Sequence, residues 1–316
     1  MTTLPHVSYG DVLDAADRIR PHVHRTPVVT NRTINEELGA SLFFKCENLQ
    51  KVGAFKARGA VNAVMALDAE LAAGGVVTHS SGNHGQAMAY AAAIRGVPCT
   101  VVMPENASAL KRRAIEGYGA DVVVTGHHER HDAAEAVLAE RGGTLIPPFD
   151  HKDVIAGQGT AALELIEEVS DLDLIVAPIG GGGLLSGTAV AASGSGSGAR
   201  VIGAEPLAVD DAHRSLESGV RQPMVADPET LADGLLTGIG ELTFDILLAA
   251  NATIVTVTEE AIVEAARFHL ERMKLVVEPS GATALAALRA MGDAIRGERV
   301  GVIISGGNTD LAWLHR

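Results

Sequence analysis

The chain has 316 residues, of which 47% are hydrophobic and only 3% aromatic, and it carries a formal net charge of −14 at pH 7. This length allows one large or two compact domains, and the composition favours an interior of Ala, Val, Ile and Leu in which helices pack on sheets. The negative charge argues against nucleic acid and anionic membranes as partners, so any attraction to phosphate must be local.

Short apolar runs alternate with helical patterns, which predicts an α/β fold of parallel sheets that bind ligands at the carboxyl ends of their strands. Ser8 and Asp11 have capping-box spacing before a helix that Pro21 ends. Residues 193–198 are interpreted as one flexible turn between a helix and a strand. Strands are expected at residues 42–45, 76–78, 100–103, 121–125, 174–177, 200–204, 254–257 and 300–304.

The cysteines and the N-terminus bear on the cellular compartment. Cys46 and Cys99 lie in apolar, strand-like stretches without metal-ligand spacing, so they are expected to be buried free thiols, as in a reducing cytosol. The first ten residues lack the basic and then apolar pattern of a signal peptide, and no apolar stretch reaches about 18 residues. A cytoplasmic protein that does not enter membranes is therefore expected.

Lys56 stands among small and apolar residues, between Phe55 and Ala57, at the start of a predicted helix. A lysine amine is a useful nucleophile only when burial or a neighbouring group suppresses its charge. Taken alone, a lysine on a first helical turn is usually a solvated charge. The apolar setting permits burial, so Lys56 is a candidate nucleophile.

The predicted strand at residues 76–78 is followed by the polar run His79-Ser80-Ser81-Gly82-Asn83-His84-Gly85-Gln86 and a helix expected over residues 87–95. Such a junction presents free backbone N–H groups and the positive end of a helix dipole, which suit a carboxylate or a phosphate. The side chains of Ser81 and Asn83 add donors. An ordinary turn with a Ser or Asn helix cap is the alternative.

Four consecutive glycines follow the strand at residues 174–177 and precede Leu184 and a helix expected over residues 186–192; they are Gly180, Gly181, Gly182 and Gly183. Without Cβ atoms, successive backbone amides can approach one anion, and a phosphate is the ligand that suits such a loop. The loop is not a Walker loop, because no Gly-Lys-Ser/Thr follows, and it lacks the spaced glycines of a dinucleotide fingerprint. A phosphate cradle is therefore predicted.

Two loops carry side chains that could hold metal. Glu205 and Asp211 follow the strand at residues 200–204, with the carbonyl of Val209 between them, and such oxygen ligands suit Mg²⁺ or Ca²⁺. Carboxylates in a loop are more often only solvated. The histidines in Gly126-His127-His128-Glu129-Arg130-His131 are interpreted as a solvated helix start.

Together with Ser305-Gly306-Gly307-Asn308 after the last strand, these segments resemble the serine racemase and serine/threonine dehydratase branch of the fold type II pyridoxal phosphate (PLP) enzymes. The motifs occur in the family's order over nearly the whole chain. The resemblance implies two open, twisted, mostly parallel sheets flanked by helices, with the cofactor in the cleft between two domains. The large domain would comprise residues 1–69 and 153–316, and the small inserted domain residues 70–152.

The resemblance also implies roles at the cofactor. Lys56 would hold the cofactor covalently and then act as the base that removes the α-proton of the substrate. Phe55 would pack beside the ring, and Asn83 would hydrogen-bond the ring hydroxyl. Ser305 would face the pyridine nitrogen, where a hydroxyl does not hold a proton as a carboxylate does, so elimination competes well with transamination. The amides for the phosphate would come from Gly180, Gly181, Gly182, Gly183 and Leu184.

Further implied roles concern the substrate. Its carboxylate would lie among Ser80, Ser81, Asn83 and His84. In racemase-like members a serine at the position of Ser81 faces the side of the cofactor opposite the lysine, so Ser81 is a candidate second base for racemisation. Arg130 lies where an arginine can approach a distal carboxylate, as in 3-hydroxyaspartate. Gly238 departs from the serine often found in its loop, which puts a hydroxyl contact to the substrate in doubt.

The family has the same spacing at its divalent site as Glu205, the Val209 carbonyl and Asp211. This implies a structural and activating Mg²⁺, or Ca²⁺ or Mn²⁺. The family also implies a homodimer, which the sequence itself does not show.

The implied activity is PLP-dependent dehydration of 3-hydroxy amino acids, in which L-threonine or L-serine yields a 2-oxo acid and ammonia, with serine racemisation as a second activity. The alternatives are a serine racemase as the main activity, a 3-hydroxyaspartate dehydratase, a β-replacing enzyme such as a cysteine synthase, and a non-catalytic PLP-binding protein. The expected partner is a small amino-acid substrate.

Overall fold

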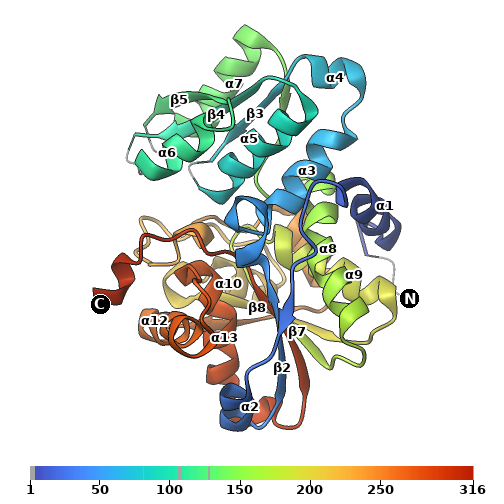
Figure 1. Ribbon diagram of the computed structural model, residues 1–316, viewed down its shortest axis with the longest axis vertical. Helices are drawn as coiled ribbons and strands as arrows, with labels where there is room; N and C mark the ends of the chain where they lie inside the picture. The colour runs from blue at the N-terminus through green and yellow to red at the C-terminus, as the bar shows by residue number, and fades with distance from the viewer. Residues whose placement is uncertain (1–3, 81, 106–108, 127–128, 316) are drawn as a thin grey trace.

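The computed structural model describes residues 4–80, 82–105, 109–126 and 129–315, and the side chains of residues 109, 110 and 131 lie outside this description. Two sheets lie one above the other in Figure 1, each flanked by helices. The upper sheet has the strand order β5 (Asp121–Thr125), β4 (Cys99–Pro104), β3 (Val76–His79) and β6 (Thr144–Leu145). The lower sheet has the order β1 (Val28–Val29), β2 (Ser41–Cys46), β10 (Arg299–Ile304), β7 (Leu174–Pro178), β8 (Arg200–Pro206) and β9 (Thr253–Val257). Every pair of neighbouring strands is parallel except β1 with β2, so the predicted fold class is confirmed.

Helices connect the strands and cover the sheets (Figure 1). The α-helices are α1 (Tyr9–Ile19), α2 (Arg32–Leu38), α3 (Lys56–Ala66), α4 (Ala69–Ala73), α5 (Asn83–Arg95), α6 (Ala109–Glu116), α7 (Arg130–Arg141), α8 (Lys152–Glu168), α9 (Gly183–Ser195), α10 (Asp211–Ser218), α11 (Glu241–Ala249), α12 (Glu259–Phe268) and α13 (Pro279–Met291). Short 3-10 helices and the π-helix His269–Met273 lie between them.

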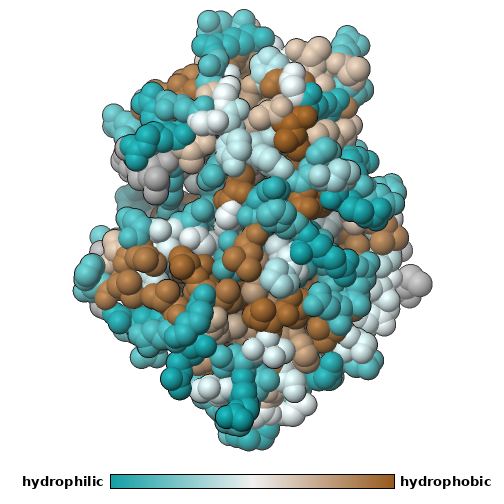
Figure 2. Space-filling view, in the orientation of Figure 1, coloured by the Kyte–Doolittle hydropathy of each residue, from teal (hydrophilic) through white to brown (hydrophobic). Residues whose placement is uncertain are grey.

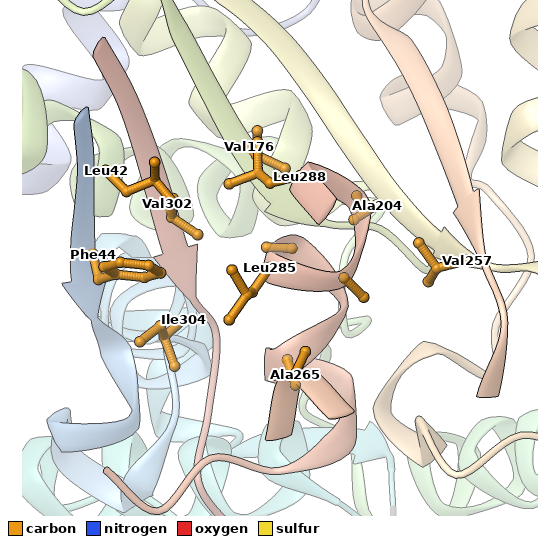
Figure 3. Packing of buried hydrophobic residues seen from close by; sticks show 14 of the residues in the cluster. Leu42, Phe44, Val176, Ala204, Val257, Ala265, Leu285, Leu288, Val302 and Ile304 are labelled. Carbon is orange, nitrogen blue, oxygen red and sulfur yellow. The ribbon is translucent and has the colours of Figure 1, made fainter. Parts of the chain in front are cut away.

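The core of the lower sheet explains its apolar strands. β7 is buried along its whole length because helices cover both faces of the sheet, and its sequence is an unbroken apolar run. In Figure 3, Leu285 and Leu288 of α13 lie among Val176 and Val302 of the sheet. These side chains belong to one buried cluster that also includes residues of α12 and β2.

Three helices fix the spacing of two segments that matter for the site. α8 packs against both α3 and α9. A Cβ on Gly157 of α8 would lie only 2.6 Å from the Cα of Gly59 in α3, and a Cβ on Gly187 of α9 would lie 2.5 Å from the N of Gly159 in α8. Only glycine permits such close backbone approach. The N-termini of α3 and α9 are therefore spaced by backbone contact through α8.

The eight predicted strands are all present, and β5 has the predicted bounds. The capping box of Ser8 and Asp11 is formed, and α1 ends before Pro21. β1 and β6 escaped prediction because two residues are too few to show an alternating pattern.

Three predicted helix boundaries are wrong. α5 begins at Asn83 and not at residue 87, so the polar run itself forms the first helical turn. α9 begins at Gly183 and not at residue 186, and it continues to Ser195, so the turn expected at residues 193–198 begins only at Gly196. This helical end packs on α1, since a Cβ on Gly194 would overlap the side chain of Tyr9. Tertiary contact therefore overrides the weak helix propensity of the Ser/Gly run.

Both cysteines are buried and free, as expected. Among the described residues, none of the helices has the length and apolar character needed to cross a membrane. Figure 2 shows the surface hollowed between the upper and lower parts of the molecule, with hydrophobic patches gathered below the hollow.

Candidate active site

The candidate site lies at the carboxyl ends of the strands, where segments distant in the sequence meet. The N–H of Phe55 donates to the carbonyl oxygen of Ser305 over 3.0 Å, and Ala54 forms a bridge with Gly306. These contacts join the loop before α3 to the end of β10. They bring Phe55, Lys56 and Ser305 together.

Lys56 is half-buried at the N-terminus of α3. Its Nζ donates to the carbonyl oxygen of Pro148 over 2.7 Å and lies 5.1 Å from the centre of the Phe55 ring. Burial lowers the pKa of the amine from 10.5 to about 8. The amine therefore loses its proton much more readily than an exposed lysine does, which brings its pKa closer to the neutral range that a nucleophile or a base needs.

The N-terminus of α5 is a candidate anion site. Its N-cap residue is Gly82, which has no side chain to cap the helix, and no other cap is formed by the residues that the structure describes. The Ser or Asn cap considered from the sequence is thus not formed among the described residues, and Ser81 lies outside them. The first N–H groups of α5 remain available to a carboxylate or a phosphate.

Asn83, the first residue of α5, is held by two side chains. Its Nδ2 donates to Oε1 of Glu278, and its Oδ1 accepts from Nδ2 of Asn308, both over 2.9 Å. One N–H of the Asn83 amide is left for a ligand. Burial and the charge of Asp233 raise the pKa of Glu278 from 4.5 to about 8. Glu278 was not predicted as a site residue, because its only signal in the sequence is an acidic side chain before Pro279.

The other predicted substrate residues lie at the same edge of the upper sheet. Ser80 is half-buried just after β3, where its Oγ accepts from the N–H of Gly82 over 3.4 Å. His84 is buried; its Nε2 lies 3.3 Å from the carbonyl oxygen of Ile146, and its Nδ1 has no partner. Burial and the charge of Lys56 hold the pKa of His84 well below 6.5, so the ring is neutral. Arg130 is half-buried at the start of α7, which follows β5.

The glycine loop forms a second uncapped helix N-terminus. α9 begins at Gly183, its N-cap Gly182 has φ +91°, and no side chain caps it. A Cβ on Gly181 would overlap the ring of Phe149, and one on Gly182 would lie 2.7 Å from Cβ of Thr243. The carbonyl of Gly181 is fixed by the hydroxyl of Thr243, 2.8 Å away. Side chains are thus excluded from a loop whose amides stay free, and Leu184 is buried behind it.

The segment Pro148-Phe149-Asp150 connects these features and was missed from the sequence. Pro148 accepts from Lys56, and Phe149 packs on the glycine loop. The carboxylate of Asp150 accepts from the N–H groups of Glu241 and Leu242, which caps α11. The segment carries no motif that would have revealed it.

The predicted metal residues form a buried pair of carboxylates. Glu205 accepts from the N–H groups of Ala212 and His213, and Oδ2 of Asp211 accepts from that of Ile239. Oδ1 of Asp211 is buried without a partner. Burial raises the pKa of Glu205 from 4.5 to about 8 and also raises that of Asp211.

The described residues contain no group of three or more His, Cys, Asp or Glu arranged to hold a metal ion. A cation bound by Glu205 and Asp211 would therefore need the carbonyl oxygen of Val209 and water molecules as its further ligands. The unpartnered Oδ1 of Asp211 fits a cation. Gly238 lies beside this pair, since a Cβ there would be 3.6 Å from Oδ2 of Asp211.

Comparison with known proteins decides the family. A family model described as pyridoxal-phosphate dependent enzyme matches residues 19–306. The chain belongs to this family. The chain is 49% identical to the serine racemase of Dictyostelium discoideum, and the alignment covers 100% of this chain and 99% of the relative. It is 47% identical to the L-threo-3-hydroxyaspartate ammonia-lyase of Saccharomyces cerevisiae, with 96% and 94% covered.

A solved structure agrees with this assignment. The crystal structure of the threonine deaminase from T.th. matches with a TM-score of 0.91 and 44% identity, over 96% of this chain and 99% of that chain. The fold is that of the fold type II PLP enzymes. The site of this PLP-dependent enzyme fits the cofactor, because the uncapped glycine loop suits the phosphate and Lys56 supplies a deprotonable amine.

Proposed function

We propose that this chain is an ammonia-lyase of 3-hydroxy amino acids, which converts L-threonine, L-serine or L-threo-3-hydroxyaspartate to a 2-oxo acid and ammonia. The observation that carries the proposal is the Lys56 amine, whose pKa is about 8, together with two uncapped helix N-termini. The names of the relatives support the substrate class, because they include a hydroxyaspartate ammonia-lyase and a threonine deaminase.

In the proposed mechanism the amides of Gly180, Gly181, Gly182, Gly183 and Leu184 would hold the phosphate of PLP. Lys56 would hold the cofactor covalently, Phe55 would pack beside its ring, and Asn83 and Ser305 would be the polar partners of its hydroxyl and its nitrogen. When bound, PLP would withdraw electrons from the α-carbon of the substrate. The N–H groups of α5, with Ser80 and His84 nearby, orient the substrate carboxylate, and the freed Nζ of Lys56 accepts the α-proton.

Lys56→Ala tests this scheme. Borohydride reduction followed by mass spectrometry of the peptides should show PLP on Lys56 in the wild type and none in the variant. Release of 2-oxo acid from the three substrates should be lost as well. Turnover by Lys56→Ala would contradict the proposal. Product formation only with an added thiol would instead support a β-replacing enzyme.

Serine racemisation is the second candidate activity, because the Dictyostelium relative is a serine racemase and this chain has Ser81. A hydroxyl base opposite Lys56 would return a proton from the other face. Ser81→Ala should therefore abolish conversion of L-serine to D-serine while 2-oxo acid release survives. Equal loss of both activities would contradict a separate role for Ser81.

Arg130 is proposed to select substrates with a distal carboxylate. Arg130→Met should raise the KM for L-threo-3-hydroxyaspartate by about 10- to 100-fold, as expected for a lost charge-assisted hydrogen bond of about 1.5–3 kcal/mol. The KM for L-threonine should change little. A parallel change for both substrates would indicate a structural role.

Glu205, the Val209 carbonyl and Asp211 are proposed to bind Mg²⁺, or Ca²⁺ or Mn²⁺. A cation would keep both buried carboxylates ionised and satisfy Oδ1 of Asp211. Mg²⁺ should raise the melting temperature of the wild type, and chelation should reverse the rise. Asp211→Asn should remove the effect, and a wild type whose melting temperature ignores all three ions would argue against the site.

Residues 70–152 are proposed to move as the small domain that closes over the substrate, with residues 1–69 and 153–316 as the large domain. Lys111 of α6 and Asp233 form an ion pair of 2.5 Å that joins the upper part to a loop of the lower part. Such a pair would hold the closed form and exclude water. A homodimer is also proposed, and light scattering of the purified protein tests it.

A further inference from the structure

A buried cluster of four charged side chains lies behind the candidate site and takes no part in the proposed chemistry. Lys45, Glu47 and Arg58 are fully buried, and the side chain of Glu164 is only 15% exposed. The two cations and two carboxylates balance one another. They come from β2, the 3-10 helix after it, α3 and α8.

Arg58 is the centre of this cluster. Its guanidinium makes two hydrogen bonds to Glu47, of 2.7 and 2.8 Å, and two to Glu164, both of 2.8 Å. It also donates to the hydroxyl of Thr160 and to the carbonyl of His24. A planar fork held by two carboxylates from different elements has a fixed orientation as well as a fixed position.

Arg58 and Lys56 lie in the same first turn of α3. The two residues are two positions apart on α3, so their side chains leave the helix about 200° apart. The side chain of Arg58 enters the buried cluster, whereas the Nζ of Lys56 donates to the carbonyl of Pro148. The main chain of this turn is held by the close contact of Gly59 with Gly157 and by the N–H of Gly59, which donates to Oε1 of Gln158. Arg58 adds a long buried side chain to this hold, whereas Ala57 and Ala60 are small and the helix has no cap from its N-cap side chain.

A small rotation of this turn would matter at the amine. The Nζ of an extended lysine lies about 8 Å from the helix axis, so a rotation of about 20° would move it by about 3 Å. Misplacement of a reacting group by about 1 Å can reduce a rate by about 100-fold.

We propose that Arg58 is a positioning residue for Lys56, and that its paired carboxylates lock the rotation of the first turn of α3 so that the amine points to the α-carbon of the substrate. The inference rests on the proposed role of Lys56. It differs from a merely structural cluster, which would support the fold without affecting the reactivity of the amine in the folded protein.

Two glutamates one turn apart on α8 provide a matched test. Glu164→Gln removes one charge of the cluster but leaves an acceptor, whereas Glu167→Gln changes an exposed glutamate that pairs with Arg25 at the surface. The first readout is the rate at which added PLP becomes fixed on Lys56, trapped by borohydride and measured by mass spectrometry. The second is kcat and KM for L-threonine, measured well below the melting temperature of each variant.

Glu164→Gln should slow both trapping and kcat by about 10- to 100-fold with little change in KM, and Glu167→Gln should match the wild type. If Glu164→Gln does not fold, Arg58→Lys retains the charge without the fork and should show the same loss. A folded variant with a lower melting temperature but wild-type trapping and kcat would overturn the proposal. Failure of Lys56 itself to take up PLP in the wild type would instead refute the proposed function.

Discussion

Lys56→Met is expected to stabilise the cofactor-free protein even though it removes the proposed catalytic amine. Burial lowers the pKa of Lys56 from 10.5 to about 8, and this difference corresponds to about 3 kcal/mol at about 1.4 kcal/mol per pH unit. Methionine is uncharged but loses the hydrogen bond to Pro148, worth about 1 kcal/mol. A net gain of about 1–2 kcal/mol near pH 7 is expected, or about 2–4 °C in melting temperature.

The dependence of this gain on pH tests its cause. Well below pH 8 the amine is protonated in both the folded and the unfolded chain, so the folded wild type carries the full cost of the buried charge. Between pH 8 and 10.5 the unfolded chain binds a proton that the folded chain has lost, so the stability of the wild type rises with pH. The advantage of Lys56→Met should therefore shrink across this window.

Urea unfolding of the cofactor-free proteins at several pH values from about 7 to 10 measures these differences. Lys152→Met is the control, because Lys152 is exposed at the start of α8 and its replacement should change stability by less than about 0.5 kcal/mol. If Lys56→Met gains nothing at pH 7, or if its gain is the same at pH 10, burial of the charge is not the cause and the reasoning fails.

Three other substitutions test the site. Gly181→Ala should weaken PLP binding by about 10- to 100-fold in an absorbance titration, because its Cβ would overlap Phe149 and overpacking costs about 1–3 kcal/mol; Phe149→Ala in the same chain should restore part of the affinity. Asp150→Ala should lower the free energy of unfolding by about 1–2 kcal/mol, since it uncaps α11, and an unchanged value would show that the cap is dispensable. The pKa of Glu278 is raised from 4.5 to about 8, so the folded chain binds a proton that the unfolded chain has lost between these pH values, and the free energy of unfolding falls as the pH rises. Glu278→Gln should make this fall less steep. A variant with the wild-type slope would contradict the assignment.

The sequence predicted those parts of the fold that depend on local pattern. β5 and the other long strands were found because their apolar runs are bounded by turn residues, and the cap of α1 was found because Ser8 and Asp11 have a characteristic spacing. The first turn of α5 was missed because Asn83 and its polar neighbours have no apolar period. Contacts with residues distant in the chain decide such boundaries.

The same distinction holds for the site. Lys56 and the glycine loop were found because their chemistry requires particular residue types at fixed spacing. Glu278 and Pro148 were missed because they act through a position in space, one beside Asn83 and the other beside the amine of Lys56. Every residue has a backbone carbonyl, so the residue type at position 148 does not reveal that its carbonyl accepts a hydrogen bond from Lys56.

The glycine contacts of α8 have a consequence for redesign of this enzyme. Because Gly59 meets Gly157 and Gly159 meets Gly187, the span from the amine to the glycine loop is fixed by main chain and offers no side chain to vary. A library that randomises α3, α8 and α9 would mostly yield proteins that fail to assemble. Variation aimed at new substrates therefore has to come from segments outside these three helices.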